Sequence, residues 1–309
     1  MPLRRLLAAV ALTAAVTAQN RPIFRADVSE VRVDAEVLNT DGRIITGLSK
    51  GDFRVFDEGH EQLLVGFAAE EQPLDMILLF DISSSMRSKV QKVVLAAREA
   101  LHELKQGDRV SVMTFSDQTH VVSSFTMDLD SAERDILGIV DARFSGLTYM
   151  QQALDDAANC FLRDARTRRR RAILVITDNL GIRTRKEMAV VRNLWEADAL
   201  VCGLTIRDPG FPVRRAIVAI VAPYALAKVG GMDRIAEMTG GDVVRTEIPG
   251  RGFSEMMRRI RSRYSLYYAT PGGQPGSLRT VRVELSAGAR KRFPGARVLA
   301  RKGYQVSQR

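Results

Sequence analysis

The stretch Asp75–Ser85 (DMILLFDISSS) limits the folds open to this chain more than any other. Its first part, Met76–Phe80, is an unbroken apolar run with the length of a strand, which is typical of a strand buried on both faces. Asp81, Ser83 and Ser85 follow at alternate positions. A carboxylate and two hydroxyls that leave the carboxyl end of a buried strand can converge on one hard cation.

Similar apolar runs recur along the chain and alternate with segments whose apolar residues have helical spacing. The strongest run, Ala172–Thr177 (AILVIT), is rich in β-branched residues, as expected for a central parallel strand. Further strands are expected at 109–115, 119–125, 200–206 and 243–244, and helices at 90–104, 131–140, 150–162, 186–197, 232–238 and 253–263. This alternation predicts a doubly wound, mostly parallel α/β sheet whose ligand sites lie beyond the carboxyl ends of its strands.

The segments on either side of this domain have β character instead. In Ser29–Leu38, small apolar and charged residues alternate, which is typical of a half-buried strand. A turn follows at Asp41-Gly42, and alternation returns at Val281–Leu285 and again at 297–304. We therefore expect the N- and C-terminal segments to supply a small β module beside the α/β domain.

The sequence is thus expected to have four parts. These are a signal peptide at 1–18, an N-terminal β segment at 19–72, the α/β domain at 73–264 and a C-terminal β segment at 265–309. Within the α/β domain, Asp208–Ala225 contains several prolines and is expected to be an irregular insertion around the apolar piece Ala216–Val221. We expect this piece to be a short buried helix, and an exposed apolar patch for a partner is the alternative.

Residues 1–18 have the order of features found in a secretory signal. Two arginines precede an apolar run of small residues, and the sequence Val-Thr-Ala ends at Ala18. Cleavage near Ala18 would make the protein periplasmic or secreted, without a transmembrane span. The alternative is an uncleaved membrane anchor, for which the apolar run is short. Export permits disulfides, yet Cys160 and Cys202 are expected to be separate buried thiols because one ends a helix and the other lies in a core strand.

The net charge is +10, from 46 basic and 36 acidic side chains, and most of the basic ones are arginines. Such a balance can indicate binding to nucleic acid or to an anionic surface, and Arg163–Arg171 (RDARTRRRR) is the densest basic run. A run of this kind is more often the solvated end of a helix, and here it precedes a buried strand. No aromatic–basic pattern accompanies it, so we do not expect a nucleic-acid partner.

Two further oxygen-bearing side chains occur where a doubly wound sheet would bring them to the cation. Thr148 (SGLTYMQQAL) lies in a loop directly before an expected helix, and Asp178 (ILVITDN) ends the strongest strand. Taken alone, Thr148 is also explained as a helix N-cap and Asp178 as a turn residue. Together with Asp81, Ser83 and Ser85, they make a five-residue site in the order D-x-S-x-S, Thr, Asp.

This order resembles the metal-ion-dependent adhesion site of von Willebrand factor type A domains. The stretches LNTDGRIITGLSKGDFRVFDEG, IAEMTGGDVV, RRIRSRYSLYYATP and ARKGY extend the resemblance to about residues 25–305. They look like the exported von Willebrand A-related proteins common in Acidobacteria, in which β segments precede and follow the A domain. The resemblance implies a Rossmann-like A domain and a metal site, without naming a partner.

The resemblance also implies a chemistry for the five residues. Ser83, Ser85 and Thr148 would bind the metal through their hydroxyls, and Asp81 and Asp178 would often act through waters. Mg²⁺ suits such an oxygen site, and Mn²⁺ and Ca²⁺ remain open as alternatives. Because neutral hydroxyls leave the ion electrophilic, an Asp or Glu of a partner protein can complete its shell. An exported adhesion or scaffolding module is therefore the expected function.

Catalysis is the alternative for the serines of residues 83–85. A hydrolase would need an activating base, and the G-x-S-x-G elbow is absent. The three histidines, His60, His102 and His120, fall outside the loops expected at the carboxyl ends of the strands. We therefore do not expect an enzyme.

Two positions depart from the family pattern. Ser84 stands where the related proteins often have glycine, and Asn179 replaces the glycine that commonly follows the strand-end aspartate. A second acidic residue often found shortly after that aspartate is also missing. Asn tolerates a positive φ better than most residues, so the turn after Asp178 is expected to form.

Overall fold

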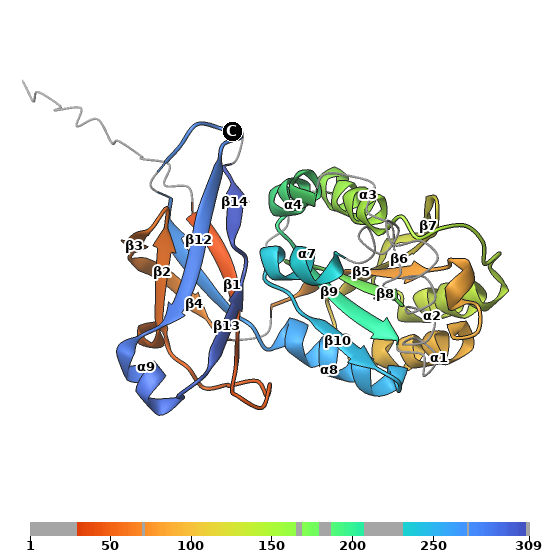
Figure 1. Ribbon diagram of the computed structural model, residues 1–309, viewed down its shortest axis with the longest axis horizontal. Coiled ribbons are helices and arrows are strands. Elements are labelled where there is room, and N and C mark those ends of the chain that lie inside the picture. The colour runs from red at the N-terminus through yellow and green to blue at the C-terminus, as the bar shows by residue number, and fades with distance from the viewer. Residues whose placement is uncertain are drawn as a thin grey trace, which may run out of the picture.

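The structure is a computed structural model that describes residues 30–69, 72–164, 169–178, 187–206, 231–270 and 272–306. The described residues form two units, an α/β domain and a module of β-strands (Figure 1). The expected signal peptide at 1–18, the turn residue Asn179 and the insertion at 208–225 lie outside the described residues.

The centre of the α/β domain is a sheet in which six described strands lie in the order β10-β9-β8-β5-β6-β7. The strands are β5 (Leu74–Asp81), β6 (Arg109–Phe115), β7 (Thr119–Thr126), β8 (Arg170–Thr177), β9 (Ala199–Ile206) and β10 (Val243–Thr246). Among them only β7 is antiparallel to its neighbour. This topology confirms the predicted doubly wound, mostly parallel sheet.

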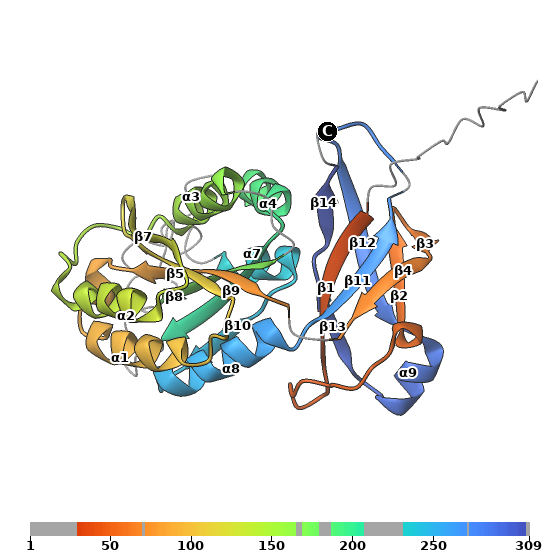
Figure 2. The ribbon, with the colours of Figure 1, turned by 180° about the vertical axis from the view of Figure 1, so that it is seen from behind.

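Helices cover both faces of this sheet (Figures 1 and 2). One layer holds α1 (Val90–Leu101), α2 (Leu129–Gly138) and α8 (Pro249–Arg261), and the other holds α3 (Met150–Arg163), α4 (Glu187–Glu196) and α7 (Met232–Thr239). Leu78 and Phe80 of β5 pack into the first layer, whereas Ile77 and Leu79 pack into the second. Because both faces are buried, every position of β5 before Asp81 favours an apolar residue, apart from the paired Asp75.

The β module consists of two four-stranded sheets among the described residues. One sheet contains β1 (Glu30–Leu38), β4 (Leu64–Ala68), β11 (Tyr264–Ala269) and β13 (Arg297–Ala300), and the other contains β2 (Phe53–Asp57), β3 (His60–Gln62), β12 (Leu278–Leu285) and β14 (Gly303–Gln305). Side chains of both sheets share one apolar core, with Val33 and Leu266 from the first and Val55 and Val283 from the second. The module is therefore a small sandwich built from both terminal segments.

The α/β domain is inserted into this sandwich between two neighbouring strands. The chain leaves the sandwich after β4 and returns to it in β11, and these strands pair antiparallel with Ser265 opposite Ala68. The two connections therefore lie side by side, and the strands of the sandwich fix the position of both.

Two features of the C-terminal segment were not predicted. The β character expected at 297–304 divides into β13 and β14, which belong to different sheets. The chain crosses from one sheet to the other between Ala300 and Gly303, and a Cβ at Gly303 would lie 2.6 Å from the carbonyl oxygen of Arg279. The short helix α9 (Ala287–Arg292) was not predicted, because Ala289 is its one buried residue and no apolar periodicity marks it.

The charged face of β1 is covered rather than solvated. Asp34 lies 3.3 Å from Arg170 of β8, and Glu36 lies 2.9 Å from Arg263. These pairs lie between the sandwich and the α/β domain. The expected alternation is present in β1, where Arg32 and Asp34 are half-buried, but Glu36 on the same face is fully buried because paired charges replace water there.

Within the described structure, Cys160 and Cys202 are free thiols, and they pack in opposite helical layers of the sheet. Cys202 is buried as expected, whereas Cys160 is partly exposed. None of the helices in the described ranges is long and apolar enough to cross a membrane.

Candidate metal centre

Asp81 is the last residue of β5 and lies at the carboxyl edge of the central sheet, between β6 and β8. Its carboxylate is buried and held from two sides. The backbone N–H of Ser83 donates to Oδ1 at 2.8 Å, and the hydroxyl of Thr177, at the end of β8, donates to Oδ2 at 2.6 Å. The side chain is therefore fixed by both the loop that follows it and the adjacent strand.

The loop after Asp81 places alternate side chains on the inner side. The N–H of Ile82 donates to the carbonyl of Phe115 at 2.8 Å, which continues the pairing with β6 for one residue. The hydroxyl oxygens of Ser83 and Ser85 then lie 3.3 Å apart, whereas the intervening Ser84 is exposed. Asp81, Ser83 and Ser85 thus face the same region, as their spacing predicts.

Thr148 reaches this region in a loop that is tied to the neighbouring turns. The N–H of Ser145 donates to the carbonyl of Ile82 at 3.3 Å, and the N–H of Tyr149 donates to the carbonyl of Ser116 at 2.8 Å. Thr148 is buried between these two anchors. The N-cap of α3 is Tyr149 rather than Thr148, so capping does not account for the threonine.

Asp178 directly follows β8 and is buried beside the same edge. Its Oδ2 accepts a hydrogen bond of 3.0 Å from the ammonium of Lys89, which also donates to the backbone carbonyl of Ser85 at 3.1 Å. Lys89 therefore links two of the predicted ligand residues.

Lys89 is a member of the site that sequence reasoning missed. It occupies the N-cap position of α1, and its side chain is nearly buried. The signal was present in the spacing, because Lys89 lies four and eight residues before Val93 and Ala97 of the buried helix face. A lysine in line with such a stripe points toward the domain interior.

The electrostatics of the site favour an added cation. Burial raises the pKa of Asp81 to about 6, although the hydrogen bonds from Ser83 and Thr177 act in the opposite direction, and the nearby charge of Asp178 raises it further. A cation between these carboxylates would relieve both the desolvation and their mutual repulsion.

The donor set fits a hard divalent ion. Asp81 and Asp178 offer carboxylate oxygens, and Ser83, Ser85 and Thr148 offer hydroxyl oxygens, which are ligands of the kind that Mg²⁺, Mn²⁺ and Ca²⁺ accept. Within the described residues, no group of three or more His, Cys, Asp or Glu side chains could hold a metal. The candidate centre instead takes three of its five predicted ligands from hydroxyls, and this composition is unlike that of a structural zinc site.

Residues 76–181 match the family model of the von Willebrand factor type A domain. This part of the chain is a von Willebrand factor type A domain. The match begins in β5 and ends shortly after Asp178, so the A-domain model covers all five predicted ligand residues. No protein with a curated description matches the chain.

Solved structures with some likeness to the chain include further proteins of this kind. A von Willebrand factor type A protein from Catenulispora acidiphila is 13% identical with a TM-score of 0.48, over 92% of this chain and 76% of that chain. An aerotolerance-related membrane protein from Bacteroides fragilis is 16% identical with a TM-score of 0.47, over 60% and 98%. Proximal thread matrix protein 1 from the mussel byssus, with a zinc-occupied MIDAS motif, is 11% identical with a TM-score of 0.47, over 66% and 49%.

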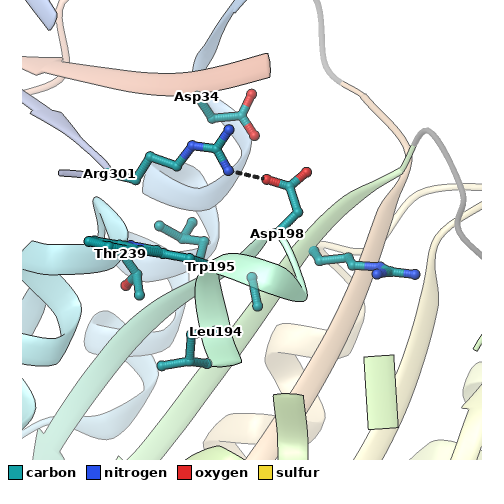
Figure 3. A pocket seen from close by; sticks show the side chains of 9 residues that line it. Asp34, Leu194, Trp195, Asp198, Thr239 and Arg301 are labelled. Carbon is teal, nitrogen blue, oxygen red and sulfur yellow. Dashed lines mark hydrogen bonds and ion pairs between the residues drawn. The ribbon is translucent and has the colours of Figure 1, made fainter. Parts of the chain in front are cut away.

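A pocket lies at the opposite edge of the A-domain sheet, where the sandwich contacts it (Figure 3). Its walls include Asp34 of β1, Trp195 of α4 and Asp198, which directly precedes β9. Asp198 accepts hydrogen bonds from Arg301 at 2.8 Å and from Arg32 at 2.5 Å. These paired charges join the two units, and the pocket is separate from the candidate metal centre.

Proposed function

We propose that the A domain binds a divalent cation through Asp81, Ser83, Ser85, Thr148 and Asp178, and that the cation takes a carboxylate from a partner protein. Mg²⁺ is the cation we favour, with Mn²⁺ and Ca²⁺ as alternatives. In this proposal the protein is an exported adhesion or scaffolding module.

The observation that carries the proposal is the convergence of the site on one buried edge. The Asp81 carboxylate is held by Ser83 and Thr177, the hydroxyls of Ser83 and Ser85 lie 3.3 Å apart, and Asp178 follows the adjacent strand. Asp81 and Asp178 are buried beside each other. Although Lys89 pairs with Asp178, burial and the charge of Asp178 still raise the pKa of Asp81, so a further cation there would be favourable.

The roles of the residues follow from their chemistry. The hydroxyls of Ser83, Ser85 and Thr148 are neutral donors that would leave most of the charge of the ion in place. Asp81 and Asp178 would hold the ion from the protein side and orient the hydroxyls. When bound, the cation would supply a Lewis-acidic position for an Asp or Glu of the partner.

The location of the site supports a role in binding a partner. The strands of the A domain begin beside the sandwich, where Arg170 contacts Asp34, and end at Asp81 and Asp178. Asp178, which directly follows β8, lies eight positions after Arg170, or roughly 26 Å of extended chain. The sandwich therefore does not lie over the carboxyl edge. Leu147, next to Thr148, is exposed there and offers an apolar contact beside the carboxylate position.

Binding rather than catalysis is the proposed activity. Among the described contacts, the hydroxyls of Ser83 and Ser85 have no histidine partner that could activate them. The basic run also gives little support to nucleic-acid binding, because Arg170 and Arg171 are buried within β8. Their guanidinium groups donate to backbone carbonyls and are turned away from solvent.

Calorimetric titration of the purified protein with Mg²⁺ tests the proposal. The wild type should bind one ion, and Asp81→Ala should abolish binding while leaving the circular dichroism spectrum unchanged. Asp41→Ala, which removes an exposed carboxylate of the sandwich, is the matched control and should bind as the wild type does. An Asp81→Ala variant with wild-type affinity for Mg²⁺, Mn²⁺ and Ca²⁺ would refute the metal site. A pull-down with and without chelator then tests whether a partner requires the ion.

A further inference from the structure

The ammonium of Lys89 lies at the candidate metal centre itself. Its Nζ is 3.0 Å from Oδ2 of Asp178 and 3.1 Å from the carbonyl oxygen of Ser85. The side chains of the ion pair are 10% exposed for Lys89 and 2% exposed for Asp178. Water therefore screens this charge poorly, and its field acts on any ion held by the same carboxylate.

Lys89 is distinct from the other basic groups of this region. Arg87 is exposed, and its guanidinium donates to the carbonyl of Phe144 at 2.6 Å rather than to a ligand residue. Lys92, one turn along α1, is exposed to solvent. Among the basic residues of α1 and of the described loop before it, Lys89 is the one that contacts a candidate ligand.

The local charge depends on this residue. The carboxylates of Asp81 and Asp178 together carry two negative charges, and Lys89 reduces the sum to one. A divalent ion would then bring the site to one net positive charge. Without Lys89, the same ion would only neutralise the two carboxylates.

We infer that Lys89 sets the charge of the metal centre: it weakens the hold on the divalent cation and leaves the loaded site with a positive charge that attracts an anionic ligand. This inference rests on the proposed function. It assigns to Lys89 a role in positioning and in setting the charge of the site, although Lys89 is not part of the D-x-S-x-S, Thr, Asp motif. The ammonium and the ion compete for Asp178, while both attract the same carboxylate of a partner.

Mg²⁺ titration by calorimetry tests the first half of the inference. Lys89→Met and Lys89→Gln remove the charge, and each should bind Mg²⁺ roughly tenfold more tightly than the wild type or better, since close charges in a poorly screened site contribute at least that much. Lys89→Arg keeps the charge and should stay near the wild-type affinity. Lys92→Met removes an exposed charge from the same helix and should change the affinity by less than about twofold.

A second titration tests the effect on the anionic ligand, with acetate as the carboxylate probe. Replacing chloride by acetate should increase the apparent Mg²⁺ affinity of the wild type, because acetate binds the positively charged loaded site. The increase should be smaller in Lys89→Met, in which the loaded site is neutral. Circular dichroism and the melting temperature of each variant, recorded with and without Mg²⁺, report whether the fold is retained.

The outcomes separate this inference from the proposed function. Equal or weaker Mg²⁺ binding by both folded neutral variants, with binding abolished in Asp81→Ala, would overturn the role of Lys89 and leave the metal site standing. Absence of Mg²⁺, Mn²⁺ and Ca²⁺ binding in the wild type and in both neutral variants would overturn the proposed function together with the inference. Tighter Mg²⁺ binding by the neutral variants, with the affinity of Lys89→Arg unchanged, supports the inference about Lys89.

Discussion

Arg170 of β8 and Asp34 of β1 form an ion pair across the junction of the A domain and the sandwich, with Nε 3.3 Å from Oδ2. The same guanidinium donates to the carbonyls of Ile260 and Arg261 at 3.0 Å each, at the end of α8. Arg170 is 2% exposed. One buried side chain therefore joins a central strand of the A domain, the last helix of that domain and the first described strand of the sandwich.

Removing this guanidinium should destabilise the whole protein. Arg170→Met leaves the partly buried Asp34 with the more distant Arg32, 3.7 Å away, and with the hydroxyl of Ser265, and it frees the carbonyls that end α8. Breaking a buried pair costs up to about 3–5 kcal/mol. We expect a correspondingly lower midpoint of guanidinium-induced unfolding, followed by circular dichroism. Arg54→Ala, which removes an exposed ion pair with Glu61, should change the midpoint little. A similarly small change in the unfolding midpoint of Arg170→Met would contradict the contribution to stability that we assign to Arg170.

The stability contributed by Asp34 should depend on pH. Burial would raise the pKa of Asp34, but the charges of Arg170 and Arg32 and the hydroxyl of Ser265 outweigh it and hold the pKa well below the ordinary value of 3.8. A lowered pKa contributes stability that is present above the ordinary value and is lost as the pH falls toward the folded-state value.

Asp34→Asn isolates this contribution. The variant should unfold at a lower denaturant concentration than the wild type at pH 7, and the gap should narrow as the pH falls below about 4. Unfolding midpoints measured between pH 7 and pH 3 give the comparison. Asp41→Asn, at an exposed turn of the sandwich, should show no such gap. If the difference in unfolding midpoint between Asp34→Asn and the wild type is constant from pH 7 to pH 3, the variant loses stability through packing rather than through the charge of Asp34.

Mg²⁺ affinity should fall in acid, because the ion and a proton compete for Asp81. Burial raises the pKa of Asp81 to about 6, so the affinity should be constant above that pH and should decrease below it, by about tenfold per pH unit at most. Thr177→Val removes the hydroxyl that donates to Asp81 at 2.6 Å, which favours the ionised form. In Thr177→Val, the decrease in Mg²⁺ affinity should therefore begin at a higher pH. Thr177→Ser keeps a hydroxyl and should have the wild-type dependence of affinity on pH. Profiles that coincide for all three proteins would exclude this role of Thr177.

The sequence predicted those parts of the fold in which the order of apolar and polar residues along the chain follows directly from which side chains are buried. Met76–Phe80 forms an apolar run because helices cover both faces of β5, and Asp81, Ser83 and Ser85 share one side because their spacing alternates. Thr148 was expected from its place before a helix, and the structure ties its loop to the neighbouring turns.

The features that were missed depend on contacts between distant segments. The alternation in β1 shows which face is apolar, but it does not show that Asp34 and Glu36 meet arginines more than 100 residues away. Lys89 was likewise not singled out, because its partner Asp178 is 89 residues further along the chain. A single sequence does not show which partner a charged residue has, even where spacing, as for Lys89, indicates a buried position.

The two thiols should differ in reactivity. Burial raises the pKa of Cys202 to about 11 and places it in the helical layer opposite to that of Cys160, which is partly exposed. A thiol of this kind has little thiolate at neutral pH and no access for a reagent. Titration of the native protein with Ellman's reagent should therefore modify Cys160 alone, and titration in denaturant should modify both. Cys160→Ser should remove the native reaction entirely. Because the cysteines lie in opposite layers, purification without reductant should give the same result. Loss of both thiols from the count in denaturant under those conditions would show that they pair.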